Sequence, residues 1–484
     1  MRLRHLALPF LLAALAGCTL APDYRRPASP VPADWPDGPA YAATGDDTEA
    51  GDTLPPAEIG WREFFAGDPV LIELIERSLG GNRDLRAAVL DVQRVRAQYR
   101  IQRAALLPRI DANAGYTRQE QPATGGGVGE TEYYEVNAGV SGYELDLFGR
   151  VRSLERQALY EYLSTYEARR SAQIALIAEV ADTYLTLLAD RALLRLSEST
   201  LENRRRSLAL IRRRFESGIG SELDVQQART TVETARADRA RYRRLVAQDL
   251  NALRLLVGGE LPAGLSRERT LADLDLSLTV PAGLDSRLLL RRPDVRGAER
   301  TLQAANARIG AARAAFFPTI SLTGSYGTLS GDLDGLFESG SEAWRFTPGI
   351  SLPIFDAGER RANLDVAELR KRIEIANYED AIQSAFREVA DALAARGTLD
   401  EQLDAQAERA RAADAGLRLS RKRYDAGIEN YLTVLDSQRT VYTARQDVID
   451  SRRAVLGNRI ELYRALGGGW REVTASARPV AAGD

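Results

Sequence analysis

The chain has 484 residues, of which 44% are apolar, 27% charged and 7% aromatic, and its formal net charge is −3. This balance gives no basic surface of the kind that binds nucleic acid. The only histidine is His5, the only methionine is Met1 and the only cysteine is Cys18. If the chain is processed before Cys18, these counts exclude metal sites built from His and Cys, Cys–His or Ser–His catalysis, and disulfides.

The N-terminus predicts a lipoprotein signal peptide over residues 1–17. A short basic region precedes an apolar stretch, residues 6–14, that is too short to span a membrane. The sequence Leu15-Ala16-Gly17-Cys18 resembles the bacterial lipobox, in which the cysteine thiol is lipidated and becomes the first residue. We therefore expect a covalent lipid on Cys18. Thr19 stands where inner-membrane lipoproteins often carry Asp, which favours the outer membrane.

The rest of the chain is an internal duplication. Residues 84–108 align with residues 294–318, and the later segments 214–219 and 423–428 align as well. In each half we expect a medium helix, a strand, a Gly-rich loop, a strand, a very long helix, a Gly turn and a second long helix. A period this long indicates two tandem copies of one domain and not a short-repeat solenoid.

Four segments alternate apolar and polar side chains with a period of two, which predicts β-strands. The aromatic residues near the strand ends suit a membrane interface, but a soluble antiparallel sheet shows the same alternation. The strands alone therefore leave both readings open. The Gly-rich loops Gly125-Gly126-Gly127 and Ser330-Gly331-Asp332 are expected at the hairpin tips. The apolar positions are Ile110, Ala112, Ala114 and Tyr116; Tyr134, Val136, Ala138 and Val140; Ile320, Leu322, Gly324 and Tyr326; and Trp344, Phe346, Ile350, Leu352 and Ile354.

The two very long helices are predicted at Arg150 to Glu216 and Glu359 to Asp425, because neither segment contains proline. Each would reach about 100 Å at the α-helical rise per residue. Within the first, the spacing of apolar residues by three and four resembles a coiled-coil seam. Helices of this length must pack side by side in a bundle, a barrel or a filament. The seam residues are Ile177, Val180, Tyr184, Leu187, Leu188 and Leu194.

The lipobox and the strand count favour a membrane barrel shared between chains. Single-chain outer-membrane barrels begin at about eight strands, and this chain offers four such segments. Open sheet edges are not stable in lipid, so several chains must complete one barrel, and the strand arithmetic allows two, three or four. The polar strand face would line a water-filled lumen. The hairpin tips would lie outside the cell and the long helices in the periplasm.

With these features in place, the chain resembles the TolC-like outer-membrane factors. It is most similar to the lipoprotein (NodT-type) outer-membrane channels of tripartite drug-efflux pumps of the RND class. The resemblance covers nearly all of the chain after residue 17. The phrases that carry it are Cys18-Thr19-Leu20-Ala21-Pro22-Asp23-Tyr24, Tyr143-Glu144-Leu145-Asp146-Leu147-Phe148-Gly149-Arg150, Arg292-Pro293-Asp294-Val295 and Asn430-Tyr431-Leu432-Thr433-Val434-Leu435-Asp436-Ser437-Gln438-Arg439.

The resemblance implies an α+β membrane protein in which three protomers form a twelve-stranded outer-membrane β-barrel, continued by a periplasmic α-helical barrel. It also implies the division of the chain. The expected parts are the signal peptide 1–17, a lipid-anchored and equatorial segment 18–80, a first outer-membrane-efflux repeat 81–257, an equatorial linker 258–292, a second repeat 293–469 and a tail 470–484.

The function that the resemblance implies is that of a passive exit duct for small molecules, and not of an enzyme. Its expected partners are two further copies of the chain, outer-membrane lipid, a periplasmic adaptor and an RND-type inner-membrane transporter. The adaptor would dock at the helix-hairpin tips, here Gly218, Ile219, Gly427 and Ile428. No cofactor is expected beyond the lipid on Cys18, and no nucleic acid.

A periplasmic gate is also implied, because a resting cell cannot tolerate a wide open duct. The positions that match the gate residues of the family are Asp224, Tyr424, Asp436 and Arg439. Arg439 could pair with Asp436, which lies on the same helix face, or with a neighbouring chain. Some relatives carry a basic residue where this chain has Glu429, so Asp224 would depend on Tyr424 alone. The alternative reading is that these are solvated residues of a helix surface.

Other functions remain as alternatives. Within the duct class, the chain could serve type I protein secretion, whereas soft-metal efflux is disfavoured because the processed chain has no Met or His. A coiled-coil scaffold without a pore would show no conductance in planar bilayers. An enzyme is disfavoured because paired acids such as Asp46-Asp47 lie in a Pro-, Ala- and Gly-rich stretch.

Overall fold

The computed structural model describes residues 19–41, 56–122, 128–266, 269–274, 276 and 285–474. Cys18, the predicted signal peptide and the Gly125-Gly126-Gly127 loop lie outside these residues. Two compact units make up the chain. The first holds the described part of Met1–Ala28 with Asp91–Tyr166 and Gly297–Glu379, and the second holds the described parts of Ser29–Leu90, Glu167–Arg296 and Asp380–Asp484. Each unit therefore draws on both halves of the sequence.

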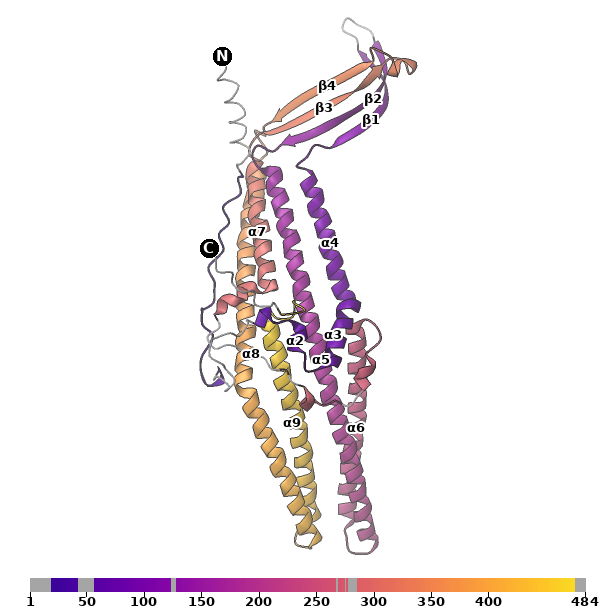
Figure 1. The fold of residues 1–484 in the computed structure, drawn as a ribbon, viewed down its shortest axis with the longest axis vertical. Coiled ribbons are helices and arrows are strands. Elements are labelled where there is room, and N and C mark those ends of the chain that lie inside the picture. Colours follow the sequence, from indigo (N-terminus) through magenta and orange to yellow (C-terminus); the bar gives the residue numbers. More distant parts are fainter. Residues whose placement is uncertain are drawn as a thin grey trace, which may run out of the picture. The chain divides into compact units, whose positions relative to one another are not determined.

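The elements are labelled as in Figure 1. The α-helices and strands are α2 (Trp61–Phe64), α3 (Pro69–Gly81), α4 (Arg83–Ala104), β1 (Ile110–Pro122), β2 (Val128–Leu145), α5 (Arg150–Glu216), α6 (Glu222–Val257), α7 (Pro293–Ala314), β3 (Thr319–Ser330), β4 (Glu342–Ser351), α8 (Glu359–Asp425) and α9 (Tyr431–Ala465). The short 3-10 helices are η1 (Pro39–Tyr41), η2 (Pro56–Glu58), η3 (Ala263–Ser266), η4 (Leu271–Asp273), η5 (Ser286–Arg291) and η6 (Asp334–Phe337).

The internal duplication is visible in the helix lengths. The helices α4 and α7 each have 22 residues, and α5 and α8 each have 67. The bounds of α5 and α8 are those expected from the sequence. Among the described helices, α5 is long and apolar enough to cross a membrane by length and composition alone, but 56% of its most apolar window is buried. A core helix of a soluble domain passes the same test, and this part of α5 packs in the core of the second unit.

The first unit contains a four-stranded antiparallel sheet with the order β1-β2-β3-β4. Ala112 lies opposite Ala138, Ala138 opposite Tyr326, and Tyr326 opposite Trp344. Because side chains alternate between the faces of a strand, these registers place the predicted apolar positions that lie within the four observed strands on one face. The four predicted strands and their common apolar face are confirmed.

Two details of the sheet differ from the expected pattern. The register of β2 and β3 shifts between Val140 and Tyr143, where Gly142 has φ +65°. This irregularity keeps the later apolar residues of β2 on the same face as the earlier ones. The alternation was also expected to continue to Ile354, but β4 ends at Ser351. Ser351 lies opposite Thr319, the first residue of β3, so β3 offers no partner residue for Leu352 or Ile354.

An extended N-terminal segment lies against α7 within the first unit. The side-chain amide of Asn306 donates to the Pro22 carbonyl at 2.7 Å. The Tyr24 hydroxyl donates to Glu299 at 3.0 Å, and Arg26 forms two bonds to the same carboxylate at 2.8 and 2.9 Å. These contacts fix the chain that directly follows the predicted lipidation site onto a helix.

The second unit is built around a hydrophobic core that includes α2, α3, α5 and the C-terminal parts of α6 and α9. A buried carboxylate orders its centre. One oxygen of Asp68 accepts from the backbone N–H groups of Val70 and Leu71 and so caps α3. The other accepts from the Tyr184 hydroxyl of α5 at 3.0 Å and pairs with Arg269 at 2.9 Å. Both of its oxygens are therefore engaged, as a buried charge requires.

An ion cluster with a buried arginine lies at the start of α7. Arg292, of which 5% is exposed, pairs with Asp294 at 2.6 Å and with Glu388 at 2.8 Å, and it donates to the Ala465 carbonyl at 2.7 Å. This guanidinium joins the segment before α7 to α8 and to the end of α9. These contacts give Arg292 and Asp294 of the phrase Arg292-Pro293-Asp294 a structural role.

Candidate functional site

The apolar face of the sheet is bare in the single chain. Trp344, Phe346 and Ile350 of β4 are 76%, 61% and 73% exposed. The strands β1 and β4 are the two edges of the sheet, so each carries unpaired backbone groups. An exposed apolar face with open edges marks a surface that another chain, lipid or both must cover.

The turns that close the two long helix hairpins have the same geometry. Gly218 and Gly427 have φ values of +76° and +72°, which favour glycine. After α5, the N–H of Ile219 donates to the Arg214 carbonyl at 2.9 Å, and after α8 the N–H of Ile428 donates to the Arg423 carbonyl at 2.9 Å. These bonds form the glycine-type helix ending. They leave the isoleucine of each turn 71% and 66% exposed.

Asp224, a predicted gate residue, caps its own helix. The Asp224 N–H donates to the Ser221 hydroxyl, and the Asp224 carboxylate accepts from the Ser221 N–H, so both sides of a capping box are present at the start of α6. Among the described residues it has no hydrogen bond to Tyr424, the partner considered for it. The pattern Ser221-x-x-Asp224 is a sequence signal for this role.

Tyr424 is held by its ring. The ring centroid lies 5.4 Å from that of Tyr431 and 4.9 Å from the Arg214 guanidinium. Arg214 belongs to α5, whereas Tyr424 and Tyr431 belong to α8 and α9, so the cation–π contact joins the two hairpins. Burial raises the pKa of Tyr431 to about 12. The two tyrosines pack with the hydrophobic cluster in which the hairpins meet.

The remaining predicted gate residues form pairs on exposed surfaces. Asp436 and Arg439 of α9 lie 3.0 Å apart, which is one of the two pairings considered for Arg439. Glu429 accepts from Arg423 at 3.3 Å within the same turn. This glutamate is therefore paired within its own turn. Tyr424 therefore contacts the other hairpin through Arg214. Asp224 and Asp436 instead bond to residues of their own helix or its cap, Ser221 and Arg439.

A second contact between the hairpins was not found from the sequence. Arg204 of α5 is 6% exposed, donates to the Thr231 carbonyl of α6 at 2.9 Å and lies over the Tyr442 ring of α9 at 5.2 Å. The Tyr442 hydroxyl donates to Asp238 of α6 at 3.1 Å. The sequence does mark Arg204 as unusual, because it occupies a position of the three-and-four apolar spacing between Leu201 and Leu208. A charged residue in such a seam indicates a specific role.

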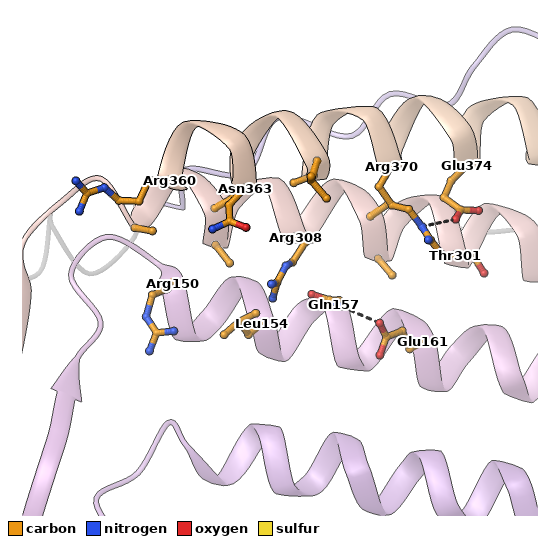
Figure 2. Close-up of a pocket in the computed structure, with 17 residues that line it drawn as sticks. Arg150, Leu154, Gln157, Glu161, Thr301, Arg308, Arg360, Asn363, Arg370 and Glu374 are labelled. Atoms are coloured by element: carbon orange, nitrogen blue, oxygen red, sulfur yellow. Dashed lines mark hydrogen bonds and ion pairs between the residues drawn. The ribbon is translucent and has the colours of Figure 1, made fainter. Parts of the chain in front are cut away.

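A cavity of about 550 Å³ lies between α5, α7 and α8 in the first unit. Figure 2 shows Arg308 of α7 extending toward α5, with Arg370 paired to Glu374 on α8 and Gln157 bonded to Glu161 on α5. Arg308 has no ion-pair partner among the described residues. The cavity lining therefore combines basic and polar side chains with a group of small residues. The small residues of the lining are Ala304, Ala305, Ala311, Ala312, Ala315 and Ala367.

Two carboxylates share a site in the second unit. Asp190 of α5 is buried, and Asp249 of α6 has one carboxylate oxygen that is buried without a hydrogen-bond partner. Burial and the charge of Asp190 raise the pKa of Asp249 to about 6. Arg241 and Arg453 partly offset this effect at the pair. The pair therefore holds a proton more tightly in the folded chain than in the unfolded one.

The part of the chain that the structure describes contains no candidate metal site. No group of three or more His, Cys, Asp or Glu residues there is placed to hold a metal ion. What the described residues offer is a membrane-type sheet surface, two exposed hairpin turns and polar contacts between hairpins.

Comparison with known proteins identifies the family. The family model described as outer membrane efflux protein matches residues 74–259 and 284–468. The probable efflux pump outer membrane protein TtgC of Pseudomonas putida is 52% identical over 466 residues, which cover 96% of this chain and 95% of that protein. The toluene efflux pump outer membrane protein TtgI of the same species is 51% identical over 464 residues, which cover 95% of this chain and 97% of that protein.

Solved structures agree with the sequence comparison. The open-state crystal structure of the Neisseria gonorrhoeae MtrE outer membrane channel superposes with a TM-score of 0.84 at 40% identity, covering 95% of this chain and 100% of that one. The family and these relatives are channel proteins and not enzymes, in accord with the expectation from the sequence. The chain belongs to the outer membrane efflux protein family and is an outer-membrane efflux channel protein of a Gram-negative bacterium.

Proposed function

We propose that three copies of this chain form one closed barrel and serve as the passive exit duct of a tripartite efflux system. The observation that carries the proposal is the bare apolar face of a sheet whose edges, β1 and β4, are both open. In a barrel, β4 of one copy pairs with β1 of the next, so that every backbone group is satisfied in lipid. Three copies of the four-stranded sheet give twelve strands.

The segments 18–80, 258–292 and 470–484 are proposed to form the equatorial belt. Contacts among their described residues support this assignment. The Trp61 N–H donates to the Arg471 carbonyl at 3.0 Å, and the Ser286 N–H donates to the Ala33 carbonyl at 2.9 Å. Each bond joins two of these segments across a large distance in the sequence. The segments 81–257 and 293–469 remain the two repeats of the proposed division.

The cargo is proposed to be small toxic molecules, including drugs and organic solvents. The support is similarity to relatives whose names assign them to efflux pumps, one of them a pump for toluene. An inner-membrane transporter of the RND type is proposed to supply the energy, on the family resemblance. The test is complementation: a strain without its own outer-membrane component should regain solvent and drug resistance only with the matching adaptor and transporter.

Type I protein secretion is the alternative cargo. The same complementation strain can carry a secreted reporter protein together with a type I transporter and its adaptor. Export of the reporter without any gain in drug resistance would favour the alternative. Resistance without reporter export would favour small-molecule efflux.

A lipid on Cys18 is proposed as a second anchor. Thr19, the first described residue, lies with its hydroxyl 3.4 Å from that of Ser153, near the start of α5. Thr19 directly follows Cys18 in the sequence, and helix α5 begins a few residues after β2 ends. Labelled palmitate should be incorporated by the wild type and not by Cys18→Ser. With a plain signal peptide, Cys18→Ser should still give membrane-inserted oligomers, because the barrel spans by itself.

The helix-hairpin turns are proposed as the docking points of the periplasmic adaptor. Their exposed isoleucines, Ile219 and Ile428, follow the left-handed glycines Gly218 and Gly427. Because Cys18 is the only cysteine, Ile219→Cys places a single thiol of known position at one turn. That thiol should cross-link to the adaptor in cells. A cysteine at exposed Leu90 is the control and should not cross-link.

A periplasmic gate at Asp224, Tyr424, Asp436 and Arg439 is proposed on the family resemblance. Three copies of Asp436 around one axis would form an acidic ring that favours cations. Asp436→Ala should reduce the preference for cations in planar bilayers and add leak to vancomycin in cells. The matched control is Asp391→Ala, which breaks another exposed Arg–Asp pair, Arg387–Asp391, on α8. Unchanged selectivity and leak in Asp436→Ala would contradict its place in the gate.

A further inference from the structure

A small basic cavity lies where α5, α8 and α9 meet in the second unit. Its volume is about 300 Å³. The charged and polar residues that matter for its chemistry are Arg204, Arg418, Arg421, Arg445, Asp414 and Gln438. Four guanidinium groups therefore face one carboxylate, and an arginine keeps its proton in proteins.

Arg204 is the buried cation of this cavity. It is 6% exposed, and its Nη1 donates to the Thr231 carbonyl at 2.9 Å. Its Nε is buried without an acceptor. Burial lowers the pKa of Arg204, with only partial offset from Tyr442 and Asp238. A desolvated guanidinium with an unused donor is costly unless an anion or another acceptor reaches it.

The neighbouring acids are already engaged. Asp414 accepts two bonds from Arg445, at 2.9 and 3.1 Å. Asp238, outside the cavity lining, accepts from the Tyr442 hydroxyl at 3.1 Å. The cavity therefore has an excess of positive charge that these acids do not balance.

The other groups of the lining are open to a ligand. Among the described residues, Arg418 and Arg421 of α8 have no ion-pair partner. Gln438 of α9 has a side-chain oxygen that is buried without a donor. A ligand that fits must therefore offer several acceptor oxygens to the arginines, and a hydroxyl would also satisfy Gln438.

We propose that this cavity is a binding site for a small oxyanion, with inorganic phosphate as the best-matched representative. Hydrogen phosphate presents acceptor oxygens to Arg204, Arg418 and Arg421 and an O–H to Gln438. Arginine is well suited to such oxyanions because of its fork of donors. Sulfate satisfies the arginines alone and should bind more weakly than phosphate.

The position of the site gives the ligand a structural effect. Arg204 belongs to the α5–α6 hairpin, and Arg418, Arg421 and Gln438 belong to the α8–α9 hairpin. An oxyanion shared by these residues links the two hairpins. This consequence rests on the proposed function: if the hairpins separate when the duct opens, bound phosphate stabilises the closed state.

Binding is tested by titrating sodium phosphate into the detergent-purified wild-type oligomer in a calorimeter, with sodium chloride of equal ionic strength as the reference. We expect saturable binding with one site per chain. Arg418→Gln combined with Arg421→Gln should weaken phosphate binding at least tenfold, because two charge-assisted bonds are lost. Both residues are exposed, so this variant should fold even where substitution of buried Arg204 does not.

Arg212→Gln is the matched control, since Arg212 is an exposed arginine of α5 outside the cavity. It should bind phosphate like the wild type. Absence of saturable binding to the wild type would overturn the proposal. Equal binding by the wild type and the Arg418→Gln, Arg421→Gln variant would do the same.

A second measurement separates this inference from the duct proposal. In planar bilayers, phosphate should lower the open probability of the wild type and have less effect on the double variant. If the protein conducts and phosphate neither binds nor changes gating, only the oxyanion site is refuted. If no current is seen under any condition, the duct proposal fails, and the calorimetric titration still decides the binding site.

Discussion

Replacement of Tyr424 tests what holds the two hairpins together near their turns. The described contacts of this residue are made by its ring, to Tyr431 on the adjacent helix and to Arg214 on the other hairpin. Of these two ring contacts, only the one with Arg214 joins the two hairpins and is lost when they separate. Tyr424→Ala should therefore favour opening, whereas Tyr424→Phe, which keeps the ring, should leave the closed state nearly unchanged.

The size of the effect follows from the geometry. A cation–π contact at a half-buried site contributes about 1 kcal/mol, and the guanidinium lies 4.9 Å from the ring centroid. Three copies around one axis would contribute about 3 kcal/mol to closure. Because about 1.4 kcal/mol corresponds to a factor of ten, Tyr424→Ala should raise the ratio of open to closed channels about 100-fold.

The assay is single-channel recording in planar bilayers, together with vancomycin sensitivity of cells. Arg214→Gln should reproduce the effect of Tyr424→Ala, and the double variant should show no further increase, since both changes remove one contact. Arg213→Gln, at the exposed neighbouring position, is the control. Equal opening by Tyr424→Phe and Tyr424→Ala would show that the hydroxyl carries closure and would refute the ring-contact argument.

Three further predictions concern stability. The pKa of Asp249 is raised to about 6, against 3.8 for an ordinary aspartate. The folded protein therefore binds this proton more tightly than the unfolded chain does. As a result, the free energy of unfolding falls as the pH rises between these two values. Asp249→Asn should raise the melting temperature at pH 7 and flatten this dependence, and a variant as pH-sensitive as the wild type would contradict the assignment. Arg292→Met should lower stability by about 1–3 kcal/mol in denaturant titrations, because the bonds from its buried guanidinium to Asp294, Glu388 and the Ala465 carbonyl are lost. Arg287→Met, at an exposed ion pair, should have little effect. Gly258→Ala should lower the free energy of unfolding by about 2 kcal/mol or more, because Gly258 has φ +71° and a Cβ there would lie 2.1 Å from a carbonyl oxygen of α3. Gly259→Ala should be tolerated, because a Cβ at Gly259 would meet open space.

Local sequence rules accounted for much of the architecture. The bounds of α5 and α8 could be predicted because each run is free of proline and ends just before a turn glycine, Gly218 or Gly427. The apolar strand face could be predicted because a half-exposed strand alternates with a period of two. The register shift at Gly142 could not, because it depends on how β2 meets β3 and not on either strand alone.

The contacts between hairpins were harder to predict than the hairpins. Asp224 matched a family gate position, yet the nearby Ser221 makes it a helix cap in the structure. Arg204 and Tyr442 lie on different repeats, so no local pattern pairs them. Their contact depends on long-range packing of α5 against α9. The apolar spacing around Arg204 indicates a special position on the helix but does not identify the partner of this arginine.

The central claim is that several identical chains complete one barrel around a water-filled pore. The most direct measurement combines native mass spectrometry of the purified detergent complex with conductance recording of the same sample in planar bilayers. The account predicts a complex of three chains that inserts into the bilayer and conducts ions in discrete steps. A monomer, or an oligomer that inserts without measurable conductance, would contradict it.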